Sequence, residues 1–370
     1  MTKDLAFFPA WYAEKGDYVF VDEETLNPFL SQLPVTIQPV ALPLTRKEIK
    51  EKASLLPPME VCPWGMSRPV IYLFNQLKQK YGLPLNIPPW KDEYTWLINR
   101  RTAAGCLTDI QRQLPEMTFP TAPVFFSETE EIETYLHRHT GSFVLKTPYS
   151  SSGRGLLWLE GNRLNDNDRR RIKRILQKQK TLSLERVLDK ELDFALEFYS
   201  DGKGNIRYEG ISLFNTNSRG AYQGNKLQAQ SALRERLSAC VGEEEPNNIR
   251  QAVAHALSHT FGIRHTGYIG VDMLVYKENE SFRIHPCVEI NLRYTMGMAA
   301  IRIFENYFDK NATGLLHILY EKETGRAYEQ HRRMEKTYPP IHENGKLQKG
   351  YLSLCPVTED TNYIAYILAT

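Results

Sequence analysis

Val288-Glu289-Ile290-Asn291-Leu292-Arg293 is the stretch of sequence that decides the fold. Apolar and polar residues alternate through it, which predicts a β-strand. Its polar side chains, Glu289, Asn291 and Arg293, are two residues apart and therefore leave the same face of that strand. Strand interiors disfavour asparagine, so an asparagine between isoleucine and leucine indicates a specific role.

A further acid lies upstream, on the apolar segment Tyr268–Tyr276, which we predict to be a strand carrying Asp272. Only a short polar turn separates this segment from the strand of Glu289. An antiparallel pair would therefore bring Asp272 beside Glu289 and Asn291. Carboxylate and amide oxygens are the hard ligands that suit Mg²⁺ bound to nucleotide phosphates, and we predict that these three residues bind the metal. The alternative, three unrelated polar residues at strand edges, gives the aspartate and the asparagine no role.

A lysine-bearing hairpin is predicted further upstream. Phe143–Lys146 and Leu156–Leu159 have the composition of strands, and a loop rich in serine and glycine connects them. Glycines let backbone N–H groups approach phosphate oxygens, serine hydroxyls add donors, and Lys146 supplies a point charge for phosphate. The spacing of a Walker A loop is absent. The predicted phosphate-binding residues of the loop are Ser150, Ser151, Ser152, Gly153 and Gly155, and Arg154 is either a further phosphate contact or solvated.

Together, the lysine hairpin and the acidic strands resemble the ATP-grasp superfamily of carboxylate–amine and carboxylate–thiol ligases. The order and spacing of these segments match that family over roughly 94–304, more than half of the chain. The resemblance implies an α/β (α+β) fold in which two α+β lobes clasp ATP, preceded by a small α/β N-terminal domain. It also implies ATP and Mg²⁺ as cofactors.

The resemblance assigns residues near Leu182–Leu188 to the nucleoside. Glu185, Arg186 and Val187 match the positions that meet the adenine edge. Glu191 matches the acid that meets the ribose hydroxyls, and Asp193 competes with it for this role. The alternative for Glu185 is a solvated acid in a linker.

Three arginines complete the expected site. In the family, a lysine at the start of a helix contacts ATP. This chain has Asn99-Arg100-Arg101 at that position, so Arg100 or Arg101 is expected to contact ATP instead. Arg219 lies in the long polar loop 214–226, which borders the acceptor site in the family. Arg219 and Arg293 are expected to hold an acylphosphate or a substrate carboxylate, and we assign both as catalytic.

Composition excludes several other classes of protein. The chain has 370 residues, 42% of them hydrophobic, and a formal net charge of +2, which argues against nucleic-acid binding by bulk charge. No apolar run approaches the roughly 20 residues of a membrane span, and no signal peptide is evident, so we expect no membrane partner and a cytoplasmic protein. The five dispersed cysteines favour free thiols over disulfides or zinc.

The organisation expected along the chain has four blocks, 1–94, 95–183, 184–310 and 311–370. The first is a small α/β domain, the next two are the nucleotide-binding lobes, and the last is a C-terminal extension. The elements expected besides those above are strands at 17–21, 35–40 and 206–213, helices at 68–81, 93–106 and 249–261, a charged helix around 315–331, and a terminal hairpin of 347–354 with 363–368. His285-Pro286 predicts a sheet edge or a bulge.

The function implied by the resemblance is an ATP- and Mg²⁺-dependent ligase. A substrate carboxylate attacks the γ-phosphate to give an acylphosphate, and an amine, or a thiol, then displaces phosphate. The expected partners are small-molecule or peptide carboxylate and amine substrates, and a homodimer is a possible assembly. Two alternatives stay open at this point: a kinase that phosphorylates a small-molecule hydroxyl, and a non-catalytic nucleotide-binding module.

Overall fold

The computed structural model describes residues 3–21, 26–149, 155–159, 161–218 and 220–370. The chain forms two compact units. The central unit comprises residues 92–222 and 234–293, and the terminal unit comprises residues 1–91, 223–233 and 294–370. The four blocks expected from the sequence stay a prediction. Within the described ranges, no helix is both long and apolar enough to cross a membrane.

The central unit alternates helices with mostly antiparallel strands. Its elements are α4 (Glu93–Leu97), α5 (Arg100–Gln113), β5 (Val124–Phe126), α6 (Thr129–Arg138), β6 (Phe143–Lys146), β7 (Leu156–Leu159), α7 (Asp166–Gln179), β8 (Leu182–Arg186), β9 (Asp189–Asp201), β10 (Ile206–Thr216), α9 (Glu244–Phe261), β12 (Thr266–Glu278) and β13 (Ser281–Asn291). Helix α8 (Gln230–Val241) begins in the terminal unit and continues into the central one.

The lysine hairpin is part of a four-stranded sheet with the strand order β5-β8-β6-β7. Strands β6 and β7 pair antiparallel from Phe143 opposite Leu159 to Lys146 opposite Leu156, which confirms the predicted hairpin. Helices α6 and α7 contribute Ile132, Leu136, Ile172 and Leu176 to the buried apolar cluster of this lobe. That packing fixes the strand on which Lys146 lies.

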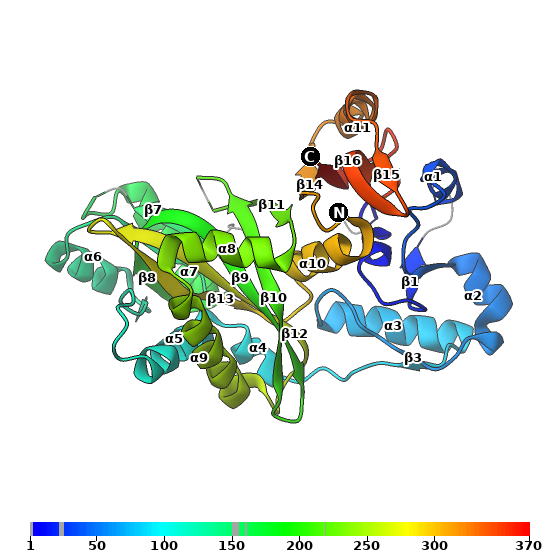
Figure 1. Cartoon of the computed structure of the whole chain (residues 1–370). Coiled ribbons are helices and arrows are strands. Elements are labelled where there is room, and N and C mark those ends of the chain that lie inside the picture. The colour runs from blue at the N-terminus through cyan, green and yellow to red at the C-terminus, as the bar shows by residue number, and fades with distance from the viewer. Residues whose placement is uncertain (1–2, 22–25, 150–154, 160, 219) are drawn as a thin grey trace. The chain divides into compact units, whose positions relative to one another are not determined.

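The acidic strands belong to a second sheet, in which β13, β12, β9 and β10 are neighbours in that order (Figure 1). Strands β12 and β13 pair antiparallel, which confirms the predicted pairing. Alternation gives this sheet two different faces. One row across it, Ile290, Val271, Leu196 and Ile211, is apolar and buried. Helix α5 packs on β13 and helix α9 on β9 and β10.

A bulge interrupts the pairing of β12 with β13. Asp272 lies opposite Glu289, but Leu274 lies opposite His285, so the segment 286–288 faces a single residue of β12. Pro286 cannot donate a ladder hydrogen bond, which accounts for the extra residues at this point. The bulge predicted at His285-Pro286 is confirmed.

The helix predicted over 93–106 is wrong as one element. Helix α4 ends at Leu97, and Asn99 has an extended backbone whose side chain accepts a hydrogen bond from the Arg101 N–H at 2.9 Å. Asparagine is a strong N-cap residue, so it starts a new helix, α5, at Arg100. This break places Arg100 in the first turn of α5.

The terminal unit joins the first and last parts of the sequence. Its elements are η1 (Phe8–Trp11), β1 (Tyr18–Val21), α1 (Leu26–Gln32), β2 (Leu42–Thr45), α2 (Arg46–Lys52), η2 (Ala53–Leu55), β3 (Met59–Glu60), α3 (Arg68–Tyr81), β4 (Leu85–Asn86), β11 (Tyr222–Leu227, whose first residue belongs to the central unit), α10 (Met296–Tyr307), β14 (Gly314–Tyr320), α11 (Arg326–Thr337), β15 (Ile341–Glu343), β16 (Lys346–Ser353) and β17 (Tyr363–Ala369). The indole N–H of Trp11 donates to the Leu354 carbonyl at 2.7 Å inside the shared core.

Two predictions in the terminal unit are wrong. The strand predicted at 17–21 is confirmed as β1, and the helix predicted at 68–81 is confirmed as α3. The predicted strand 35–40 is a turn, because Ile37 N–H bonds the Pro34 carbonyl at 2.9 Å and prolines at 34 and 39 cannot donate to a ladder. The charged helix expected around 315–331 begins only at Arg326, since Gly314–Tyr320 pairs with β17 as a strand. The terminal hairpin is confirmed as β16 with β17.

Candidate functional site

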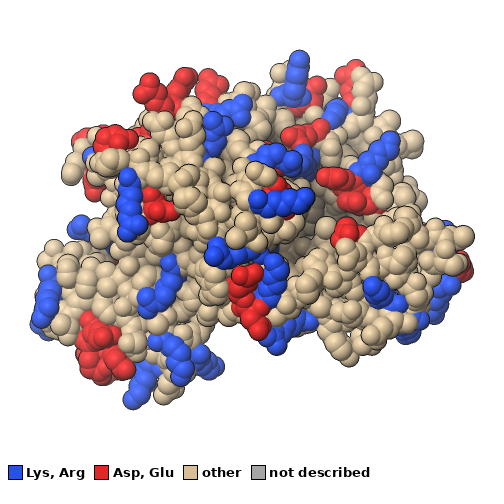
Figure 2. Space-filling view, turned by 90° about the horizontal axis from the view of Figure 1, so that it is seen from below, with Lys and Arg blue, Asp and Glu red and all other residues tan. Residues whose placement is uncertain are grey.

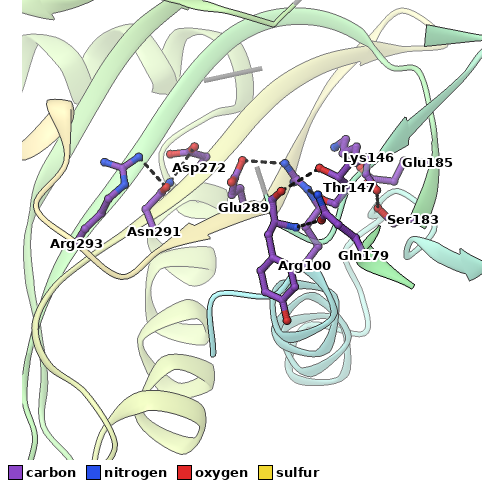
Figure 3. Close-up of polar contacts among 11 residues, drawn as sticks. Arg100, Lys146, Thr147, Gln179, Ser183, Glu185, Asp272, Glu289, Asn291 and Arg293 are labelled. Atoms are coloured by element: carbon purple, nitrogen blue, oxygen red, sulfur yellow. Dashed lines mark hydrogen bonds and ion pairs between the residues drawn. The ribbon is translucent and has the colours of Figure 1, made fainter. Parts of the chain in front are cut away.

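The three predicted metal ligands lie together on one face of the second sheet. Asp272 lies directly opposite Glu289, and Asn291 lies two residues further along the same strand. The Asn291 amide donates to Asp272 Oδ2 at 3.1 Å and accepts a hydrogen bond from Arg293 Nη2 at 3.0 Å (Figure 3). Arg293, Asn291 and Asp272 are therefore joined by hydrogen bonds, and Glu289 lies opposite Asp272 on the same face.

Asp272 is the most strongly perturbed acid of this group. Burial raises the pKa of its carboxyl to about 8, and the neighbouring carboxylates of Glu289 and Glu197 add to the rise. Arg293 and the Asn291 hydrogen bond oppose it without cancelling it. A cation bound beside this carboxyl would favour its ionised form.

This donor set fits a divalent cation with a preference for oxygen. Two carboxylates and one amide oxygen are the ligand types that Mg²⁺ takes, with water completing its coordination. No group of three or more His, Cys, Asp and Glu side chains that could hold a metal occurs in the part of the chain that the structure describes. The candidate site therefore depends on the Asn291 amide as its third protein ligand.

Lys146 is paired with a predicted adenine contact. Strands β6 and β8 pair antiparallel, with Lys146 opposite Ser183. The lysine Nζ lies 2.5 Å from Glu185 Oε2, and the two side chains are only 10% and 12% exposed. In this state the lysine charge is neutralised by Glu185, so a phosphate that binds Lys146 has to compete with that carboxylate.

Arg100 connects the two sheets. Its Nε donates to the Thr147 carbonyl at 3.0 Å, at the base of the lysine hairpin, and its Nη2 lies 3.2 Å from Glu289 Oε2 (Figure 3). Arg101 instead places its guanidinium 4.2 Å from the centre of the Phe125 ring. Of the two arginines that the sequence left open, Arg100 is the one that reaches the acids.

The residues assigned to the nucleoside lie around the β8–β9 connection. Arg186 is exposed, and the Val187 N–H donates to the Ser142 carbonyl at 2.9 Å. Glu191 is exposed near the start of β9. Asp193 accepts hydrogen bonds from Lys190 at 2.5 Å and Thr216 at 2.7 Å. The roles of these residues stay predictions.

Part of the predicted site lies outside the described residues. This holds for Ser150, Ser151, Ser152, Gly153 and Arg154 of the loop, and for Arg219. Gly155 is described, and its carbonyl accepts a hydrogen bond from the Thr147 N–H at 3.0 Å, which closes the base of the hairpin.

Two buried polar residues near these side chains were not predicted as site residues. Glu197 lies in β9 and is 1% exposed. His285 is 5% exposed and lies close enough to Lys146 and Glu185 for both charges to act on its pKa. The sequence signal for these two residues is a single glutamate or histidine inside an apolar strand. That pattern does not predict which residues of other strands lie beside it.

His285 is held neutral. Burial lowers the pKa of its imidazole to about 4, and Lys146 adds to the decrease while Glu185 opposes it. Nδ1 accepts a hydrogen bond from the Cys287 N–H at 3.3 Å, so the single ring proton is on Nε2.

We expect His285→Asn to reduce the loss of stability in mild acid. The unfolded chain takes up a proton on His285 below about pH 6.5, while the folded chain does so only near pH 4, so stability is lost as the pH falls through this window. The contribution is about 3 kcal/mol for the wild-type side chain. Urea unfolding at pH 7 and pH 4.5 measures it. The control is His255→Asn on the exposed side of α9. Equal acid sensitivity of the wild type and His285→Asn would contradict the assignment.

The four-stranded sheet with the lysine hairpin and the second sheet with the acidic strands belong to two α+β lobes. Arg100 contacts both sheets. No family model and no curated protein matches the chain. Solved structures do. A biotin carboxylase from Campylobacter jejuni, in complex with β,γ-ATP, gives a TM-score of 0.54 at 12% identity, over 95% of this chain and 81% of that one.

Other solved structures are similar. The biotin carboxylase domain of the Hydrogenobacter thermophilus 2-oxoglutarate carboxylase, with MgADP and bicarbonate, gives 0.50 at 13% identity, over 88% of this chain and 73% of that one. N5-carboxyaminoimidazole synthetase from Staphylococcus aureus with ADP gives 0.49 at 12% identity, over 96% and 87%. The chain has the ATP-grasp fold, as the resemblance implied.

Proposed function

We propose that this protein is an ATP- and Mg²⁺-dependent ligase that activates a substrate carboxylate as an acylphosphate and joins it to an amine, or to a thiol. The observation that carries the proposal is the bridge from the lysine hairpin through Arg100 to Glu289. It connects a phosphate-binding cation on one lobe to metal-binding acids on the other. The two biotin carboxylase structures described above, with TM-scores of 0.54 and 0.50, were solved with nucleotides, and one of them also with magnesium and bicarbonate.

Each polar group of the site has a task in this reaction. Lys146 and Arg100 bind the phosphates of ATP, and Arg293 holds the anionic substrate or the acylphosphate on the acidic face. Asp272, Glu289 and Asn291 hold Mg²⁺, which neutralises charge on the transferring phosphoryl group when it is bound. Arg219 and the serine loop are proposed to add contacts to the substrate and the phosphates.

The chemistry needs no nucleophile from the protein. An oxygen of the substrate carboxylate attacks the γ-phosphorus, and the bond from that phosphorus to the oxygen of ADP breaks. The amine then attacks the acyl carbon, loses a proton, and inorganic phosphate leaves. The protein contributes positioning and charge neutralisation, which together supply most of the catalysis in phosphoryl transfer.

Glu185 and Glu289 form ion pairs that compete with nucleotide binding. Each neutralises a cation that is proposed to bind phosphate, Lys146 in one case and Arg100 in the other. Binding of ATP with Mg²⁺ would replace both ion pairs, with Glu289 as a ligand of the metal and Glu185 as a contact of the adenine edge. The nucleotide and the metal are therefore expected to bind cooperatively.

The substrates are proposed to be small molecules or peptides, and a homodimer and a cytoplasmic location stay predictions. Among the described residues that Figure 2 shows, basic and acidic side chains are interspersed. This pattern supports a small substrate over nucleic acid.

The test is a screen of carboxylates with amino acids, dipeptides and polyamines for stimulated release of ADP in the presence of Mg²⁺. Stimulation by a carboxylate and an amine together supports the ligase. A kinase is stimulated by a hydroxyl compound alone, and a binding module binds ATP without turnover. Either result would replace the proposed function.

A further inference from the structure

Glu197 lies on the same sheet face as the proposed metal ligands. Two rows of directly paired residues cross the strands β13, β12, β9 and β10: one is Glu289, Asp272, Ala195, Ser212, and the next is Asn291, Gly270, Glu197, Gly210. Paired residues of a sheet point to the same side, so Glu197 points to the side of Asp272 and Asn291.

The residues next to Glu197 on its face of the sheet are small. Its partners on the two neighbouring strands are Gly270 and Gly210, and Ala195 precedes it on the same face. Glycine in a strand interior often marks a bulge or a close approach of another group. Gly210 lies at the point where the pairing of β10 with β9 shifts register, and Gly270 lies between Glu197 and Asn291 in their row.

The Glu197 side chain is buried and held by a hydrogen bond. The residue is 1% exposed, and its Oε1 accepts a hydrogen bond from Ser212 Oγ at 3.2 Å. Its negative charge contributes to the raised pKa of Asp272, so the two carboxylates interact electrostatically. A divalent cation bound on this face would favour the ionised form of Asp272, Glu289 and Glu197.

We propose that Glu197 is a positioning residue of the metal centre, which accepts a hydrogen bond from a water molecule bound to the divalent cation held by Asp272. Glu197 and Asp272 are diagonal neighbours, which lie roughly 7–8 Å apart in a sheet, with their Cβ atoms somewhat closer. That separation accommodates a cation, its bound water and a hydrogen bond. Mg²⁺ retains several waters in protein sites, and acids that orient such ligands tune metal affinity. The proposal rests on the proposed metal site.

The test uses Mn²⁺ as the probe and a non-hydrolysable β,γ-imido analogue of ATP. Electron paramagnetic resonance gives the affinity for Mn²⁺ and the symmetry of its surroundings. We expect Glu197→Gln to weaken Mn²⁺ binding about tenfold or more and to change the spectrum. Glu197→Asp, which keeps the charge, should restore part of the affinity. The matched control is Glu278→Gln, an exposed acid of β12 that pairs with Arg283 at 3.0 Å.

The outcomes separate this inference from the proposed function. Wild-type affinity and an unchanged spectrum in Glu197→Gln, with binding lost in Asp272→Asn, would overturn the role of Glu197 alone. A wild-type protein that binds no Mn²⁺ with the analogue would overturn the metal site itself. If Glu197→Gln does not fold, Ser212→Ala removes the hydrogen bond to Glu197. That variant should weaken Mn²⁺ binding several-fold, and unchanged binding would overturn the inference.

Discussion

Glu289→Gln is expected to lower ATP turnover by roughly 10³-fold while the fold is kept. The amide retains the shape of the side chain but removes the charge that Mg²⁺ needs, and metal ligands and charge-stabilising groups contribute at this scale. Glu289 also neutralises Arg100 at 3.2 Å, so the variant loses both contacts of this carboxylate.

Steady-state ADP release at saturating Mg²⁺ measures the loss, and circular dichroism with thermal unfolding checks the fold. Glu278→Gln, on the exposed end of β12, is the control and should turn over ATP like the wild type. Full activity of Glu289→Gln at ordinary Mg²⁺ concentrations would remove Glu289 from the site.

Lys146→Ala is expected to weaken ATP binding tenfold to a hundredfold and adenosine binding much less. A charge-assisted contact with phosphate contributes about 1.5–3 kcal/mol, and adenosine has no phosphate to lose. The variant also leaves Glu185 without its lysine partner, so some loss of thermal stability is expected.

The readout is therefore the ratio of the two affinities, measured by calorimetry, because a general loss of structure lowers both affinities together. Lys277→Ala is the control: this lysine is also paired with an acid, Glu280, at 3.1 Å, but it lies at the exposed end of β12. An equal loss for ATP and adenosine in Lys146→Ala would show that Lys146 is a structural partner of Glu185.

Residue spacing was sufficient to predict the pairing that builds the site. Glu289 and Asn291 at a spacing of two, and Asp272 in an apolar segment one turn upstream, lie side by side because neighbouring segments joined by a short turn pair antiparallel. The hairpin of Lys146 followed from the same kind of local pattern. Both depend on contacts between segments that are close in the sequence.

Contacts between strands that are far apart in the chain could not be predicted from the sequence. Lys146 and Glu185 were assigned to different parts of a nucleotide, and the structure pairs them because β6 lies beside β8. Glu197 was missed for the same reason, since its glycine neighbours come from β10 and β12. Strand β14 was predicted as helix because its partner, β17, lies at the end of the chain.

The central claim, activation of a carboxylate as an acylphosphate, is tested most directly by the products formed from a stimulating carboxylate when hydroxylamine replaces the amine. The account predicts ADP, inorganic phosphate and the hydroxamate of that carboxylate in equal amounts, all dependent on Mg²⁺ and absent in Glu289→Gln. Release of AMP and pyrophosphate would contradict it, because that result places the attack on the α-phosphate.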